Sequence, residues 1–177
     1  MGARDDDMLD VINEQGEVID TLPFREVHDK DLLHRFCRVL VINDKDEVIL
    51  HKRTSLVSDA GRLDSAGGHL DPGETYEQAI VRELAEEMDI HVSIEDLSFI
   101  GKIRDYRPSH ENMIAQVYVL SNYSGAYIGE ESEIASFVKV PLVDFLDVEK
   151  FKTYGEPSPK ITACAEAYKE YLKNNEP

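Results

Sequence analysis

Three glutamates, Glu83, Glu86 and Glu87, stand close together in the segment GHLDPGETYEQAIVRELAEEMDI, which runs from Gly68 to Ile90. In a helix, residues three and four positions apart share one face, so these carboxylates would project side by side. Three negative charges on one face repel one another unless a cation lies between them. Hard divalent cations take oxygen ligands, so the spacing indicates a metal site. The alternative is a solvated acidic helix face with local ion pairs, which the charge pattern alone favours.

The glutamates need a helix to position them, and the sequence predicts one from about Thr75 to Met88. Thr75 and Gln78 fit a capping box, with Thr75 as the N-cap residue. Ile80, Leu84 and Met88 form an apolar stripe at helical spacing. Because the glutamates lie beside this stripe, we expect them at the edge of a core rather than in open water.

The rest of the chain predicts many strands and few helices. We expect strands at residues 8–13, 17–22, 36–42, 47–52, 97–104, 113–121 and 134–140, with a short one near Ser65. We expect a helical turn or loop at 23–30, a short helix at 141–148 and a last helix at 159–172, where a proline occupies the first helical position. Strands that alternate irregularly with few helices indicate an α/β (α+β) fold with a mixed sheet between helices.

Composition narrows the class of protein. The chain has 177 residues, of which 42% are hydrophobic, and we expect one domain over residues 1–177. No apolar run approaches the roughly 20 residues that span a membrane, and the N-terminus lacks a signal-peptide core, so we expect a cytoplasmic protein without a membrane partner. The net charge of −17 argues against a nucleic acid polymer as partner. Cys37 and Cys164 form no metal or disulfide spacing and are expected in the core.

The acidic segment, with Gly68, Glu74 and the run from Arg82 to Ile90, resembles the Nudix box, the signature of the Nudix hydrolases. This resemblance implies a Nudix fold, in which a mixed sheet is sandwiched between helices. One departure is Asp89, where the family usually has a glycine that ends the helix in a left-handed conformation. Asp tolerates that conformation better than most residues, at a modest cost.

The resemblance also implies a ligand set. Glu83, Glu86 and Glu87 would bind Mg²⁺ or Mn²⁺, and the backbone carbonyl of Gly67 would add a further ligand. Arg82 would hold the acidic cluster in place through ion pairs, and Glu74 would brace the loop before the helix.

A reaction follows from the resemblance. The family hydrolyses a diphosphate linked to another moiety, and a nucleoside diphosphate derivative is the default small-molecule substrate. The metal neutralises diphosphate oxygens and lowers the pKa of a water that attacks one phosphorus. Glu87 would belong to the catalytic set with Arg82, and the general base would be Glu86 or Glu133 of the later acidic loop. Arg53 is a candidate contact for a substrate phosphate, with an ordinary surface arginine as the equal alternative.

A second likeness extends over about residues 8 to 140. The order of REVHDKDLLHRF, VLVINDKDEVILHKR, SAGGHL and SHEN parallels isopentenyl diphosphate isomerase and the Nudix hydrolases related to it. In the isomerase, histidines and glutamates hold a metal, and the matching residues here are His28, His34, His69 and Glu111. Neutral imidazoles with a carboxylate suit Mn²⁺ or Zn²⁺. Each histidine alone is better explained as a turn or surface residue, and only the set makes a second metal site an even alternative.

Two departures separate this chain from the isomerase, which moves protons with a cysteine and a glutamate. The cysteine position is Gly67 here and the glutamate position is Met113, and neither residue transfers protons. The acidic residues of the box are intact, whereas isomerases carry a degraded box, so hydrolysis is favoured over isomerisation. A third alternative is a non-catalytic module that senses a nucleotide or sugar diphosphate. A homodimer is compatible with the sequence.

Overall fold

The computed structural model describes residues 7–105 and 112–175. In these ranges the chain forms a nine-stranded mixed sheet built around one long strand, β3 (His34–Asn43). Its hydrogen-bonded neighbours are β1 (Met8–Ile12), β4 (Glu47–Arg53), β6 (Gly67–His69) and β8 (Met113–Tyr123). The outer strands are β2 (Val18–Pro23), β5 (Leu63–Asp64), β7 (Leu97–Asp105) and β9 (Ile134–Pro141). β3 and β8 run parallel and the other pairs run antiparallel, which confirms the mixed sheet.

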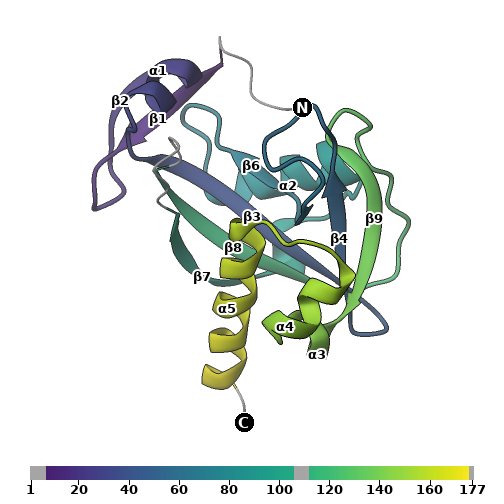
Figure 1. Cartoon of the computed structure of the whole chain (residues 1–177). Coiled ribbons are helices and arrows are strands. Elements are labelled where there is room, and N and C mark those ends of the chain that lie inside the picture. The colour runs from purple at the N-terminus through teal and green to yellow at the C-terminus, as the bar shows by residue number, and fades with distance from the viewer. Residues whose placement is uncertain (1–6, 106–111, 176–177) are drawn as a thin grey trace.

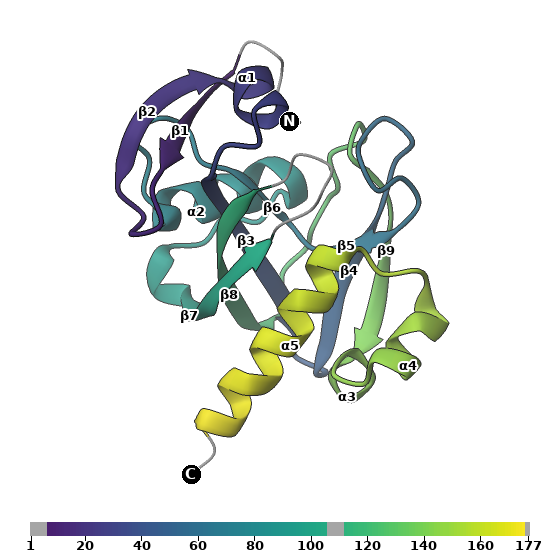
Figure 2. The same ribbon diagram turned by 60° about the vertical axis from the view of Figure 1, so that its left-hand side comes forward.

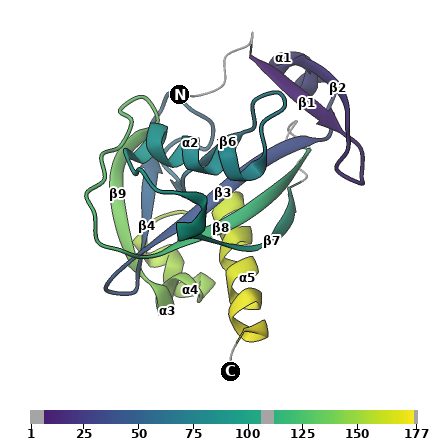
Figure 3. The ribbon, with the colours of Figure 1, turned by 180° about the vertical axis from the view of Figure 1, so that it is seen from behind.

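Two helices cover opposite faces of the sheet (Figure 1), with α2 (Tyr76–Met88) on one side and α5 (Pro159–Asn174) on the other. The view from behind places α2 in front of the strands and α5 beyond them (Figure 3). The shorter helices are α1 (Phe24–Asp29), α3 (Leu142–Phe145) and α4 (Val148–Phe151), with the 3₁₀ turns η1 (Ile94–Asp96) and η2 (Lys152–Tyr154). The sandwich of helices and mixed sheet agrees with the expected fold class. No helix in the described ranges is long and apolar enough to cross a membrane.

Side chains of β3 alternate between the two cores, as the pleat of a strand requires. Val39 and Val41 pack with α2, whereas Leu40 and Ile42 pack with the core beneath α5. The predicted stripe of α2, Ile80, Leu84 and Met88, is buried in the first of these cores. The two cysteines are buried as expected, one in each core.

Helix α2 begins and ends where the sequence predicts. Thr75 is the N-cap: its side chain accepts from the Gln78 N–H, and the Gln78 side chain accepts from the Thr75 N–H. At the other end Asp89 adopts the left-handed conformation, with φ of 52°. These two caps fix which residues lie on which face of the helix.

The other predicted strands and the last helix are also found, with ends that differ by at most two residues, but two short strands, β5 and β6, flank Ser65 where one was expected. The segment 141–148, expected as one short helix, contains α3 and the start of α4, and the sequence did not indicate η1. The β1–β2 hairpin and α1 lie together at one end of the sheet (Figure 2). Leu9, Val11 and Val27 form a small core of their own there.

Candidate active site

The three glutamates of α2 do not have the same surroundings. Glu83 and Glu87 are buried, with 7% and 5% of their surface exposed, whereas the Glu86 side chain is 44% exposed. A helix turns by roughly 100° per residue, so Glu83 and Glu87 point in nearly the same direction and Glu86 points away from Glu87. The expectation of a position at the core edge is therefore right for two of the glutamates and wrong for Glu86, which lies at the rim.

Strand β6 is shaped to receive the two buried carboxylates. The Gly67 N–H donates to Glu87 Oε2 at 3.2 Å. A Cβ atom at Gly68 would overlap the carboxylate of Glu83. The lack of a side chain at Gly68 therefore lets this carboxylate approach the backbone of β6.

Arg82 connects the acidic cluster to the loop before the helix. Its Nη1 atom donates to Glu83 at 2.8 Å and to Glu86 at 3.3 Å. Its Nε and Nη2 atoms bind both carboxylate oxygens of Glu74 at 3.0 Å, and Nη2 also donates to the His69 carbonyl at 3.0 Å. Arg82 thus forms ion pairs with Glu83 and Glu86 of the helix and with Glu74 of the preceding loop.

The buried glutamates repel one another in the absence of a cation. Burial raises the pKa of Glu83 to about 7, although Arg82 opposes this shift. Burial also raises the pKa of Glu87 well above its usual range, and the charges of Glu83 and Glu133 add to the effect. A divalent cation would relieve both effects, because it offers the buried carboxylates a positive charge. The residues present therefore fit Mg²⁺ or Mn²⁺.

The acidic loop after β8 brings Glu133 to the same place. The Glu130 N–H donates to the Glu87 carbonyl at 2.9 Å, and the Ile128 N–H donates to the Met88 carbonyl at 2.9 Å, so the loop is attached to the end of α2. Glu133 is only 7% exposed and its charge acts on Glu87. It is therefore a buried group beside the cluster rather than an exposed charge before β9.

These groups line one pocket of about 620 Å³. Glu83, Glu87 and Glu133 belong to its wall, and so do four arginine and lysine residues: Arg38, Arg53, Arg82 and Lys160. Arg53 is fixed by hydrogen bonds from Nε to the Ser58 carbonyl at 2.6 Å and from Nη1 to Asp64 at 3.5 Å. Its side chain is 15% exposed, so the structure places it at the pocket rather than on the open surface.

The sequence analysis missed two basic residues of this pocket. Arg38 is 2% exposed and donates to the buried Asp64 and to the Ser65 carbonyl. The sequence held a signal for Arg38, because a charge interrupts the apolar run of β3 and a buried charge needs a partner. The sequence held no comparable signal for Lys160, because in the sequence it is one of several lysines on an amphipathic helix.

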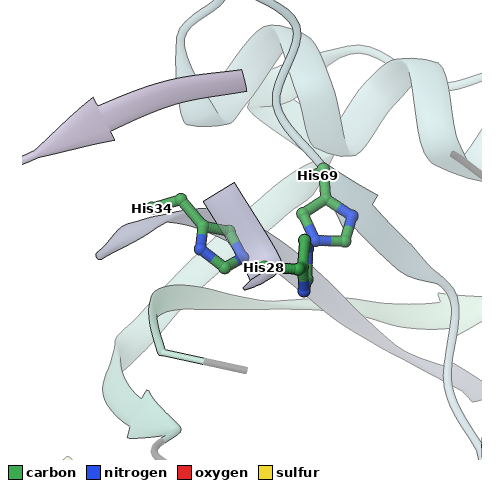
Figure 4. Close-up of side chains that lie close together, drawn as sticks. All are labelled: His28, His34 and His69. Atoms are coloured by element: carbon green, nitrogen blue, oxygen red, sulfur yellow. The ribbon is translucent and has the colours of Figure 1, made fainter. Parts of the chain in front are cut away.

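The three histidines come together from three elements (Figure 4). His28 lies in the last turn of α1, His34 begins β3 and His69 ends β6, and one ring nitrogen of each lies within 4.8 Å of the others. His34 Nδ1 is 2.9 Å from the Leu32 carbonyl, which leaves Nε2 as its free lone pair. Among the described residues, the buried Nε2 atoms of His34 and His69 have no hydrogen-bond partner.

The electrostatics of the histidine cluster also suit a metal. Burial lowers the pKa of His34 to about 4 and lowers the pKa of His69 well below its usual value. Both imidazoles are therefore neutral at pH 7, as metal ligands must be. The fourth expected ligand, Glu111, lies outside the described residues.

The model of the NUDIX domain family matches residues 32–163. The chain belongs to the Nudix family. Its box is the α2 segment with Glu83, Glu86 and Glu87, and the family's members typically use divalent metals. The resemblance to the Nudix family that the sequence showed is thereby confirmed.

Curated Nudix relatives carry different names. An uncharacterized Nudix hydrolase of Nostoc sp. is 28% identical over 59% of this chain and 63% of its own length. An isopentenyl-diphosphate Delta-isomerase of Rhizobium rhizogenes is 32% identical over 62% of this chain and 53% of that protein. An 8-oxo-dGTP diphosphatase of Escherichia coli is 27% identical over 67% of this chain and 87% of that protein. The match thus spans between about half and two thirds of the first two relatives.

Solved structures support the fold. The crystal structure of DR0079 from Deinococcus radiodurans superposes with a TM-score of 0.69 at 21% identity, and it covers 90% of this chain and 98% of that one. A MutT protein from Methanosarcina mazei gives a TM-score of 0.65 at 20% identity over 82% and 96%. The expected Nudix fold is therefore confirmed.

Proposed function

We propose that this protein hydrolyses the diphosphate linkage of a small organic diphosphate with the help of a divalent cation, Mg²⁺ or Mn²⁺. A nucleoside diphosphate linked to another moiety is the default substrate. The observation that carries the proposal is the pair of buried carboxylates, Glu83 and Glu87, beside a pocket that also holds basic side chains. Buried like charges of this kind are costly without a cation.

Each residue of the cluster has a separate task in this proposal. Glu83, Glu86 and Glu87 would hold the cation, and the carbonyl of Gly67 would be a further ligand. Arg82 positions the glutamates through its ion pairs. A cation bound there neutralises phosphate charge and makes water a better nucleophile.

Glu133 is the better-placed general base of the two candidates. It is buried in the pocket wall and its charge acts on Glu87, whereas Glu86 is 44% exposed and paired with Arg82. A base must lie within hydrogen-bond reach of the attacking water, which favours a group inside the pocket. Arg53 would contact a phosphate from the other side.

The test is a hydrolysis assay with Mg²⁺ and a panel of nucleoside diphosphate derivatives and prenyl diphosphates, with identification of products. Wild type should release phosphate-containing products from at least one compound. Glu87→Gln should lower kcat at least about a hundredfold, since even residues that support metal ligands contribute about 10–100-fold. Glu131→Gln, an exposed neighbour of Glu133 in the same loop, is the matched control and should act like wild type. Activity of Glu87→Gln equal to that of the control would contradict the proposal.

We also propose that His28, His34 and His69, with Glu111, bind a second metal ion, Mn²⁺ or Zn²⁺. The converging ring nitrogens and the buried Nε2 atoms of His34 and His69 support it. Metal analysis of the purified protein should show this ion in wild type and lose it in His69→Ala. The exposed His91→Ala is the control and should keep it. Equal metal content in both variants would argue against the site.

Isomerisation of a prenyl diphosphate is the second candidate, because several curated relatives are named isopentenyl-diphosphate Delta-isomerase. The residues speak against it. A Cβ at Gly67 would overlap the Cys37 carbonyl, so the backbone leaves no room for a cysteine there. Met113 is buried against Phe36 and Ala115 as a core residue. Uptake of solvent deuterium into isopentenyl diphosphate would support isomerisation. A third candidate is a non-catalytic module that senses a nucleotide. It would be favoured by nucleotide binding that occurs without turnover and that Glu87→Gln leaves unchanged.

A further inference from the structure

Lys160 is a buried lysine at the start of α5. Ser158 caps this helix by accepting from the Ile161 N–H, and Lys160 follows in its first turn. The Ser158 N–H donates to the Leu63 carbonyl at 2.8 Å, and the Leu63 N–H donates to the Glu156 carbonyl at 2.8 Å. These bonds attach the start of α5 to β5. The position of Lys160 is therefore set by the sheet, and its surface is only 6% exposed.

Lys160 belongs to the basic part of the active-site pocket. Its Nζ atom lies 5.5 Å from the centre of the Phe36 ring, and the guanidinium carbon of Arg38 lies 5.1 Å from the same ring. Lys160 and Arg38 both line the pocket that contains Glu83 and Glu87. The same pocket thus contains both carboxylates and cations.

The positive charge of Lys160 acts on His34, His69 and Asp64. Burial is the main cause of the low pKa of His69, and the positive charge of Lys160 adds to it. Burial acts to raise the pKa of Asp64, yet its basic neighbours, with Arg38 the strongest and Lys160 among them, keep this pKa below its usual value. The charge of Lys160 therefore acts on both the histidine cluster and Asp64, and Lys160 lines the pocket.

Asp64 has stronger partners than Lys160. Two Nη atoms of Arg38 donate to its carboxylate, and Arg53 lies 3.5 Å away. Neutralising Asp64 therefore does not require a third cation. A diphosphate brings further negative charge into a protein with a net charge of −17, so a cation in the pocket in addition to the metal ion favours its binding.

We propose that Lys160 is a phosphate-binding residue of this pocket, whose ammonium group binds a phosphoryl oxygen of the substrate in the pocket that also contains Glu83 and Glu87. This inference rests on the proposed function, since it takes the substrate to be a diphosphate. A lysine ammonium is a compact charge with three rotatable donors, which suits a phosphoryl group that changes shape during attack. Lys160 binds and positions the substrate and does not transfer protons.

The experiment compares Lys160→Met, Lys160→Gln and Lys160→Arg with Lys169→Met, which removes an exposed lysine of the same helix. KM and kcat are measured with a hydrolysed diphosphate and Mg²⁺, and the affinity for inorganic diphosphate is measured by calorimetry. Lys160→Met and Lys160→Gln should raise KM and weaken inorganic diphosphate binding by about tenfold or more, since hydrogen bonds to charged groups are of this strength. We expect kcat to stay within about threefold, Lys160→Arg to keep part of the affinity, and Lys169→Met to match wild type.

Unchanged KM and unchanged diphosphate affinity in a folded Lys160→Met would overturn the inference, and Lys160→Gln gives the same decision if the methionine variant does not fold. A loss of kcat with unchanged KM would also overturn it. Calorimetry separates the two proposals, because it needs no turnover. If hydrolysis occurs and does not depend on Lys160, the proposed function stands and the role of Lys160 is contradicted. If inorganic diphosphate binds in a manner that depends on Lys160 but no compound is hydrolysed, the proposed function is contradicted and the phosphate site stands.

Discussion

Glycines of β6 decide how closely the glutamates of α2 approach the sheet. At Gly68 a methyl group would overlap the Glu83 carboxylate, and at Gly67 it would overlap the carbonyl of Cys37. Interiors are close-packed, so a single added carbon atom forces its neighbours to move. The two glycines therefore give two predictions of different kinds, one about metal binding and one about the backbone.

Gly68→Ala should weaken Mn²⁺ binding and lower the free energy of unfolding by about 1–3 kcal/mol, the usual cost of overpacking. The cause is the Glu83 carboxylate, so the same change in a Glu83→Ala background should cost little stability. Urea unfolding of the four variants of this cycle, together with Mn²⁺ titration of the wild type and Gly68→Ala, measures both effects. An equal loss of stability in the two backgrounds would show that Gly68 is not shaped around Glu83.

Gly67→Cys should destabilise the protein by about 2 kcal/mol or more and should not produce isomerase activity. Gly67 has φ of +152° and backbone atoms beside its missing side chain, which cannot move aside as a flexible side chain would. Gly101→Cys is a matched control, because Gly101 has φ of +155° and no atom within 4 Å of an added Cβ. Comparing the thermal unfolding of both variants separates the effect of the overlap from the effect of the backbone conformation. Similar melting temperatures would show that the overlap at Gly67 has no effect on stability.

Helix α2 is the element that sets the spacing of the cluster, and its last residue departs from the family. Asp89 has φ of 52° and ψ of 33°, the left-handed conformation that glycine adopts at least cost. Its side chain is 60% exposed and contacts the exposed ring of His91. The strain at this position thus has little compensation from the side chain.

Asp89→Gly should therefore stabilise the protein by up to about 1 kcal/mol, whereas Asp89→Ala should destabilise it by a similar amount. Alanine has the strain of a Cβ without the polar side chain that helps Asp in this conformation. Both free energies of unfolding come from urea titrations. If both variants raise or both lower the free energy of unfolding, the backbone conformation at residue 89 is not the main determinant of stability at this helix end.

At the scale of the whole molecule, the sheet buries histidines that an unfolded chain would expose. His51 of β4 is 3% exposed, and burial lowers its pKa to about 4 from 6.5. Between these values the unfolded chain binds a proton that the folded chain does not. Stability is therefore complete above about pH 6.5, falls as the pH drops towards 4, and does not change further below that value from this cause.

His51→Leu should reduce this pH dependence. Between pH 7 and pH 5 the wild type should lose about 2 kcal/mol more of its free energy of unfolding than His51→Leu does. His91→Leu removes an exposed imidazole and should keep the wild-type dependence. Urea unfolding at several pH values measures the slopes, and parallel slopes for wild type and His51→Leu would contradict the assignment.

Local interactions let the sequence by itself determine much of this protein. The capping box at Thr75, the apolar stripe of α2 and the left-handed Asp89 depend on residues within a few positions, so the approximate ends of α2 could be predicted. The order of strands followed from alternation and turns in the same way. The box predicted the family for the same reason, because its spacing lies within one loop and one helix.

Only the tertiary structure decided which distant residues meet. The antiparallel pairing of β6 with β3 sets His69 opposite Phe36, and α1 then brings His28 to the same place. Burial separated Glu83 and Glu87 from Glu86, docking of the acidic loop brought in Glu133, and attachment of α5 to β5 placed Lys160 in the pocket. These outcomes depend on strand register and packing between segments far apart in the chain, for which short-range patterns hold no information.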